Sequence, residues 1–335
     1  MSCKKLFLTG VMAAAVLTAC TSDNPQQSRG PYMAEGEKKP ATTPVSVPSG
    51  SPVDPGVIVE PPEIVYEDME ITIRDYKLES EDRGKNGDYE FPYADTEYHQ
   101  LELSDTSKDQ WPDLARELDY ENQRIYEDAL AEFADSYEWA SQMDDSIRLS
   151  GNCCEADVYV LRADERMFCY STNYYAMYNG PHPTMWSVCT CFDPQDGQKL
   201  ELSDVINESD PVKLSGIIWD NLIGDALGED YEFDDVQEKT IREKIEEMVV
   251  NDELVWGMDD KALLIFFDSD KLMSYAFGPF SATINKEDYP DLVKEWYLPQ
   301  ECSPVGARIT KTDCETTIYD LAEILELTGG SAGQG

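Results

Sequence analysis

The sequence predicts an α+β protein in which helices pack on one face of a mostly antiparallel sheet, arranged as two modules and preceded by a disordered stalk. Three patterns lead to this prediction. Apolar and polar residues alternate in several strand-like segments, helix-like segments separate them, and a run rich in Pro, Ser and Thr precedes them all. Aromatic residues make up 10% of the chain and apolar residues 41%, so the folded part can bury a core.

Residues 1–20 have the parts of a lipoprotein signal peptide. Lys4 and Lys5 precede an uncharged stretch that is too short to span a bilayer, and small residues lead to Cys20. Residues 17–20 resemble the bacterial lipobox, which implies a lipid on Cys20 and a protein anchored to the extracytoplasmic face of the cell membrane. An ordinary secretory signal with a coincidental cysteine is the alternative.

A disordered linker is expected over residues 21–65, because Pro, Ser, Thr and Gly dominate there. The first module is predicted at 66–160. Its alternating segments between 66 and 104 indicate strands joined by the polar loop 79–88. Between 111 and 140, apolar residues step by three, four or seven. This spacing predicts a long amphipathic helix, with Ser107 as its cap and Pro112 in its first turn.

The second module is predicted at 161–300. Strands are expected at 156–161, 166–178 and 184–192, and the last two form a hairpin whose tip is residues 179–183. Further along the chain, the patterns predict helices at 211–227 and 234–250, a hairpin pairing 253–256 with 262–267, a strand at 280–284 and a helix at 286–296. A C-terminal helix and tail follow at 301–335, with the helix spanning 310–327 and Gly329 and Gly330 ending it.

The formal charge of −42 decides which partners are plausible. Such a surface repels nucleic acid and anionic headgroups, and it attracts cationic proteins, peptides or divalent ions. The alternative is that the acidity only keeps an exported protein soluble. No partner among nucleic acids is expected.

Seven cysteines remain once Cys3 leaves with the signal and Cys20 carries lipid. Outside the cytoplasm they can form one or two disulfides, or they can be buried thiols. Cys189 and Cys191 alternate onto one strand face beside Cys169, so a cross-strand contact is geometrically reasonable. With only two histidines and no C-x-x-C spacing, the chain shows no zinc motif, and no metal or other cofactor is expected.

A family resemblance rests on three motifs in order: a tyrosine-rich strand and turn at 174–183, a Phe-Asp turn with glycine at 192–200, and Leu-x-Asp at 202–205. With the apolar segments 262–267 and 276–284, they resemble the RsiV-type extracellular domain family (DUF3298/DUF4163-like), the C-terminal domain of lysozyme-sensing anti-sigma factors. The resemblance implies a PdaC/RsiV-like N-terminal module at 66–160 and an RsiV-like C-terminal module at 161–300.

The candidate ligand-binding residues lie on and just after the hairpin tip: Asn179, Gly180, Pro181, His182 and Trp186. His182 between two prolines is typical of a structural or contact residue, since no nucleophile is paired with it by a motif. Trp186 could present a sugar platform. Paired carboxylates such as Asp268 and Asp270 are typical of solvated surface, although glycosidases use such pairs.

No catalytic residue is assigned, and the sequence favours a non-catalytic binding or sensing module in a membrane-anchored lipoprotein. Lysozyme or another cationic envelope protein is the expected partner, because the resembling family senses lysozyme and the charge favours basic proteins. The alternative is a peptidoglycan-modifying hydrolase or deacetylase accessory.

Overall fold

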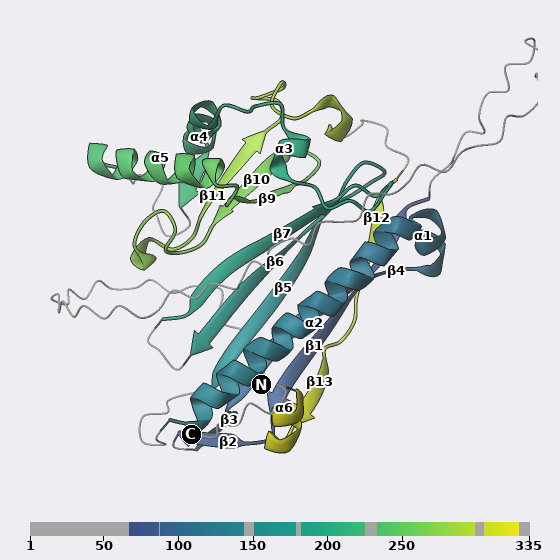
Figure 1. Ribbon diagram of the computed structural model, residues 1–335, viewed down its shortest axis with the longest axis vertical. Helices are drawn as coiled ribbons and strands as arrows, with labels where there is room; N and C mark the ends of the chain where they lie inside the picture. Colours follow the sequence, from purple (N-terminus) through teal and green to yellow (C-terminus); the bar gives the residue numbers. More distant parts are fainter. Residues whose placement is uncertain are drawn as a thin grey trace, which may run out of the picture. The chain divides into compact units, whose positions relative to one another are not determined.

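The computed structural model describes residues 67–86, 88–143, 151–178, 182–224, 233–298 and 305–327, all of which belong to one unit, Pro62–Gly335. The predicted signal peptide, Cys20 and the predicted stalk lie outside the described residues. Within them, helices and open sheets occur together, which confirms the α+β class (Figure 1).

The larger sheet has the strand order β12-β1-β4-β5-β6-β7, and β13 also pairs with β1. Its strands are β1 (Met69–Ser80), β4 (Ala94–Leu103), β5 (Asn152–Ala163), β6 (Phe168–Tyr178), β7 (Thr184–Phe192), β12 (Ala307–Lys311) and β13 (Glu315–Tyr319). The pairs β1–β4, β5–β6 and β6–β7 are antiparallel, whereas β4–β5, β1–β12 and β1–β13 are parallel. The hairpin predicted from the sequence is therefore β6–β7.

The polar loop expected at 79–88 is partly strand. Strand β1 extends to Ser80, and β2 (Arg83–Asn86) pairs antiparallel with β3 (Tyr89–Pro92). Phe91 is buried there, so this hairpin has one apolar anchor among polar neighbours.

Two helices, α1 (Asp105–Gln110) and α2 (Pro112–Ser141), occupy the segment predicted as one long helix. Ser107 is not the cap of the long helix, because α2 has Trp111 at its N-cap; Ser104 is the N-cap of α1, and its hydroxyl accepts a hydrogen bond from the Ser107 amide. Ser107 instead accepts a hydrogen bond from the Glu70 amide at 2.9 Å. No helix in the described part of the chain is long and apolar enough to cross a membrane.

Helix α2 packs along one face of the larger sheet, mainly on β4, and this contact forms the principal core (Figure 1). Leu114 and Leu118 pack against Ile71 and Leu101 in its first half. The second half places Phe133, which is fully buried, among further apolar and tyrosine side chains. Burying an apolar face in this way is what stabilises an amphipathic helix.

The buried side chain of Asn122 replaces a strand partner. Its amide accepts a hydrogen bond from the Leu101 backbone N–H and donates one to the Leu101 carbonyl, each at 2.9 Å. The register of β4 with β5 covers only residues 94–96, so Leu101 lies beyond it. Asn122 therefore satisfies backbone groups that would otherwise be buried without partners.

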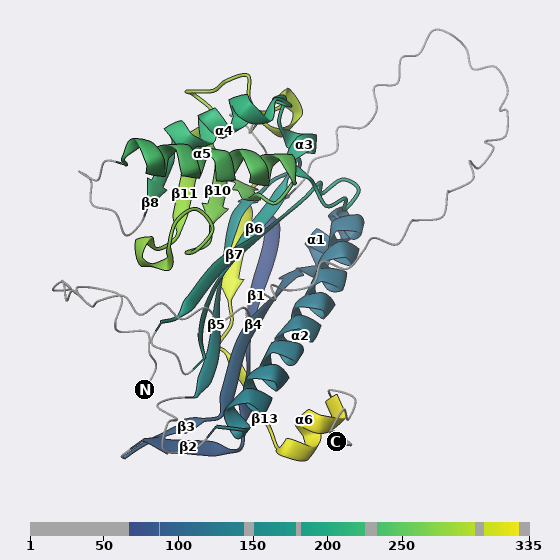
Figure 2. The same cartoon turned by 60° about the vertical axis from the view of Figure 1, so that its left-hand side comes forward.

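A smaller antiparallel sheet has the order β8-β11-β10-β9, and helices α4 and α5 pack on one of its faces (Figure 2). Its elements, with the short helix before them, are α3 (Leu202–Val205), α4 (Pro211–Asp220), β8 (Leu222–Gly224), α5 (Asp235–Val250), β9 (Val255–Met258), β10 (Ala262–Phe267) and β11 (Phe280–Asn285). The predicted hairpin of β9 with β10 is confirmed. Strand β9 contacts β7, so the two sheets meet there.

Three predicted helices were wrong in whole or in part. The helix predicted at 211–227 ends at Asp220, and residues 222–224 form strand β8, which pairs with β11. Residues 286–296 form turns and a single 3-10 turn, η2 (Glu295–Tyr297), because Pro290 lacks the N–H a helix needs and disfavours helical geometry before it. Residues 310–319 belong largely to β12 and β13, since their threonines and Ile318 favour extended backbone and β1 offers an open edge. Only α6 (Leu321–Leu327) is helical there.

Candidate functional site

The candidate residues fall at the tip of the β6–β7 hairpin and on the strand that leaves it. Asn179, Gly180 and Pro181 lie outside the described residues. His182 is exposed, and Trp186 is half-buried on β7.

Trp186 has a fixed stacking partner within the hairpin. The antiparallel register places Tyr174 of β6 directly opposite it, and the two rings stack with centroids 4.9 Å apart and planes 10° apart. One face of the indole is therefore covered by Tyr174, and the residue remains half-exposed. Burial raises the pKa of Tyr174 to about 12, so the phenol stays protonated at physiological pH.

His182 packs against Tyr275, a residue that no local sequence pattern could identify because it comes from a distant segment. The two ring centroids are 5.5 Å apart at a tilt of 44°. The Tyr275 hydroxyl donates a hydrogen bond to the Pro183 carbonyl. Tyr275 belongs to the 3-10 turn η1 (Tyr275–Phe277), which lies between β10 and β11, so a loop of the smaller sheet contacts His182 and Pro183 at the hairpin tip.

The other side of β7 is covered by the smaller sheet. The Ser187 amide donates to the Asp268 carboxylate at 3.1 Å, and the Ser187 hydroxyl donates to Asn173 at 2.9 Å. Burial raises the pKa of Asp268. This carboxylate satisfies a backbone N–H on the edge strand, which is a structural role.

Alternate residues of β6 and β7 form a partly open aromatic surface beside α2. Tyr178 donates a hydrogen bond to Glu132 of α2. Burial raises the pKa of Tyr178, and the neighbouring Glu132 carboxylate raises it further. Near Tyr174, Asp128 forms an ion pair with Arg124 at 2.9 Å.

We call this surface the α2–β7 face, defined by Tyr174, Tyr178, Trp186, Val188, Asp128 and Glu132. Val188 is 39% exposed, and the side chain of Asp128 is 68% exposed. The face combines aromatic and apolar area with carboxylates at its border. Those are groups that can contact the stems and the charged heads of Arg and Lys.

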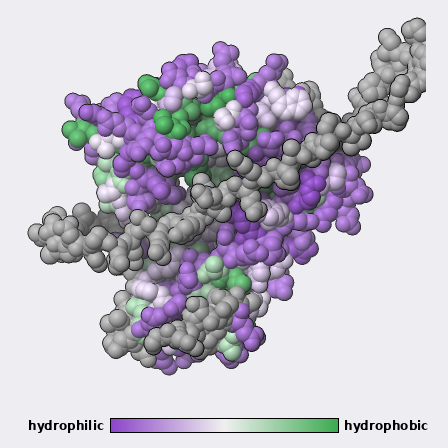
Figure 3. Space-filling view, viewed as in Figure 1, coloured by the Kyte–Doolittle hydropathy of each residue, from purple (hydrophilic) through white to green (hydrophobic). Residues whose placement is uncertain are grey.

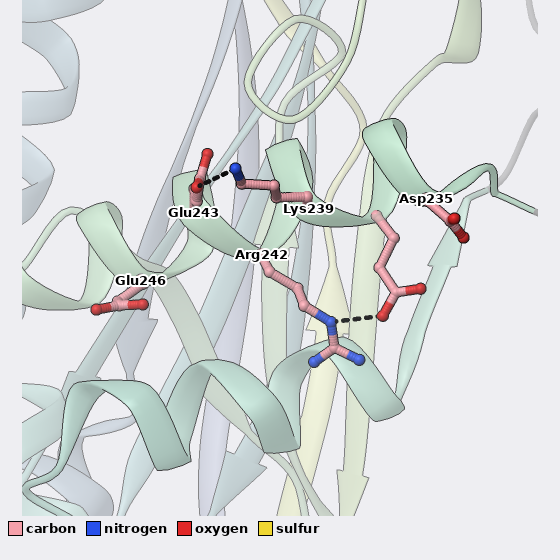
Figure 4. Close-up of a pocket in the computed structure, with 6 residues that line it drawn as sticks. Asp235, Lys239, Arg242, Glu243 and Glu246 are labelled. Carbon is pink, nitrogen blue, oxygen red and sulfur yellow. Dashed lines mark hydrogen bonds and ion pairs between the residues drawn. The ribbon is translucent and has the colours of Figure 1, made fainter.

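A hollow of about 400 Å³ lies along α5, and Figure 4 shows the side chains that line it. Four of the six charged side chains that line it are paired along the helix: Arg242 with Glu238 at 2.8 Å, and Lys239 with Glu243 at 3.7 Å. The Lys239 and Glu243 side chains are 75% and 67% exposed. Exposed i,i+4 pairs of this kind are ordinary features of a solvated helix.

The described surface is predominantly hydrophilic in the view of Figure 3, with hydrophobic residues gathered over the region of α4 and α5. Val212 and Val236 on these helices are 62% and 74% exposed. Among the described residues, no group of His, Cys, Asp and Glu has the arrangement of a metal site. Asp270, paired with Asp268 in the sequence, is exposed.

Comparisons with known proteins give structural neighbours only. No protein-family model matches the chain, and no curated protein matches it. A solved DUF3298 family protein from Pseudomonas aeruginosa has a TM-score of 0.41 and 13% identity, and the match covers 68% of this chain and 98% of that chain. A DUF3298 family member from Bacteroides fragilis has a TM-score of 0.43 and 11% identity, and the match covers 67% of this chain and 94% of that one.

Proposed function

We propose that the protein is a non-catalytic binding module, anchored by a lipid on Cys20 at the extracytoplasmic face of the cell membrane, that captures a cationic envelope protein. The observation that carries the proposal is the α2–β7 face. There Trp186 stacks on Tyr174, Tyr174 interacts with the carboxylate of Asp128, and Tyr178 is hydrogen-bonded to Glu132, so aromatic side chains and carboxylates occur together. Aromatic anchors at the centre and charges at the border are the usual composition of a protein interface.

Charge supports the same class of partner. The whole chain has a formal charge of −42, and α2 carries Asp or Glu at nine of its 30 positions against two arginines. A basic protein is therefore steered toward this helix, and it relieves repulsion among the carboxylates when it binds. The resemblance of residues 162–296 to the lysozyme-sensing family makes lysozyme the first partner to test.

The binding test is calorimetric titration of the full chain with lysozyme at low ionic strength and at about 0.15 M salt, where charges are screened beyond about 8 Å. We expect binding to weaken with salt but to persist. An unrelated protein of similar net charge is the control. Equal binding by that control, or loss of all binding at about 0.15 M salt, would reduce the interaction to bulk electrostatics.

A matched pair of variants locates the surface. Asp128 and Glu243 are both i,i+4 partners of a basic residue, and their side chains are 68% and 67% exposed. Asp128→Asn should weaken lysozyme binding by roughly threefold to tenfold, whereas Glu243→Gln should change it less than about twofold. Equal effects of the two variants would show that only total charge matters.

The anchor has its own test, independent of binding. Mass spectrometry of the mature protein should find an acylated N-terminal cysteine at Cys20, and Cys20→Ala should leave the protein unprocessed or release it from the membrane. An unmodified mature N-terminus beyond Cys20 contradicts the lipoprotein assignment.

A further inference from the structure

Three cysteine side chains gather where the larger sheet meets β9. Cys169 lies on β6, and Cys189 and Cys191 lie on β7. Cys169 and Cys191 are fully buried, while Cys189 is partly exposed. A Cβ placed on Gly257 of β9 would lie 2.7 Å from Leu161 Cδ1, and at 3.4 Å and 3.5 Å from the Cys169 and Cys189 sulfurs, so β9 lies directly against these thiols.

Cys169 and Cys191 are directly opposite each other in the antiparallel register. The Cys191 carbonyl accepts a hydrogen bond from the Leu200 amide at 2.8 Å, on the side away from β6. Cys169 and Cys191 therefore form a non-hydrogen-bonded pair, for which the Cα atoms are about 4.5 Å apart. That separation lies within the range of about 4.4–6.8 Å that a disulfide requires.

The two sulfurs of this pair are 2.7 Å apart. The distance exceeds a disulfide bond of about 2.04 Å by only about 0.7 Å. The Met258 amide donates to the Cys169 sulfur at 3.4 Å. Cys189 is opposite Ser171 and only diagonal to Cys169, a less favourable position for a bond.

We propose that Cys169 and Cys191 form a cross-strand disulfide in the mature protein and that Cys189 remains a thiol. The bond closes a loop that contains Trp186 and the tip residues 179–183, so it fixes the base of the hairpin that contributes to the α2–β7 face. In the cell, this inference rests on the proposed function in one respect: export to the extracytoplasmic face brings the cysteines to the oxidant.

The oxidant is the disulfide of a thiol–disulfide oxidoreductase or of a small-molecule disulfide. One cysteine thiolate attacks it and releases one donor thiol, which leaves a mixed disulfide. The second cysteine thiolate attacks that mixed disulfide, forming the Cys169–Cys191 bond and releasing the second donor thiol. The two cysteines lose two protons and two electrons, and the donor gains them as two thiols. Because burial raises the pKa of Cys191 in the folded protein, the bond forms before β9 closes over the hairpin.

Trypsin provides a direct count of the thiols, because no Lys or Arg lies between Arg166 and Lys199 and one peptide carries all three cysteines. The full chain is reduced and unfolded, refolded in the presence of oxidised glutathione, and then denatured, alkylated and digested. The wild-type peptide should carry one alkyl group, on Cys189, and it should carry three after prior reduction. Oxidation in vitro makes this result independent of where the protein resides.

Single variants identify the bonded pair. Cys189→Ser should leave no alkylated cysteine in the oxidised peptide, whereas Cys191→Ser should leave two. The melting temperature should fall on the order of 5–10 °C in Cys191→Ser relative to the oxidised wild type, and the reduced wild type should match that variant. Three alkyl groups on folded, oxidised wild type, or two on Cys189→Ser, would overturn the proposal.

Discussion

His99 makes stability depend on pH in a way that can be calculated. It lies on β4, is 1% exposed, and its Nε2 is 3.1 Å from the Thr172 hydroxyl of β6. Burial lowers its pKa from 6.5 to about 4. Asp75 of β1 opposes this shift, and Lys311 of β12, paired with Asp75 at 2.9 Å, adds to it.

The folded state favours neutral His99, whereas the unfolded chain takes up the proton near pH 6.5. The His99 contribution to stability is therefore fully present above pH 6.5 and is lost as the pH falls toward 4. The free energy of unfolding should drop by about 2 kcal/mol at pH 5 and by roughly 3 kcal/mol below pH 4 from this residue alone.

Urea unfolding at pH 7.5 and pH 5.0 measures the effect in wild type, His99→Gln and His182→Gln. The carboxylates are common to all three proteins, so their contribution cancels in the comparison. His99→Gln should lose about 2 kcal/mol less than wild type between the two pH values, and the exposed His182→Gln should behave as wild type. The reasoning is refuted if His99→Gln keeps the wild-type pH dependence or if NMR titrates His99 near 6.5.

Three further substitutions test the fold by urea unfolding. Gly197→Ala should cost roughly 2 kcal/mol or more, because Gly197 has φ +71° and a Cβ would lie 2.6 Å from the Asp113 carbonyl; a cost below about 0.5 kcal/mol would contradict this. Asn122→Ala should cost about 2–3 kcal/mol by leaving the buried Leu101 amide and carbonyl unpaired, and a neutral result would show that water replaces the side chain. Phe133→Ala should cost about 3–5 kcal/mol, against little for exposed Tyr120→Ala.

Local sequence patterns correctly predicted the helices and hairpins that form because of residues close together in the chain. The β6–β7 hairpin, α2, α5 and the β9–β10 hairpin follow from periodicity and turn residues, so they lie close to their predicted positions, and α4 begins where it was predicted. Pro290 should have ended the predicted helix at 286–296, because its ring is a local signal that outweighs the apolar spacing around it.

Contacts between distant segments could not be predicted in this way. Strands β12 and β13 are extended because β1, more than 200 residues earlier in the chain, offers them an edge. Tyr275, in a turn between two strands of the smaller sheet, donates a hydrogen bond to Pro183 at the hairpin tip. Asn122 is hydrogen-bonded to the backbone of Leu101, which lies 21 residues earlier in the chain. In the candidate site, Trp186 was identified from its place after the turn, but its stacking on Tyr174 depends on a register that only the structure gives.

The central claim is that a cationic protein binds at the α2–β7 face, and the effect of removing Trp186 tests it most directly. Trp296 is the matched control, because it is 51% exposed and lies in η2, outside that face. In calorimetric titration with lysozyme at about 0.15 M salt, Trp186→Ala should raise the dissociation constant by about tenfold or more, while Trp296→Ala should change it less than about twofold. If both variants bind like wild type, or if both lose the same affinity, the partner does not bind at this face.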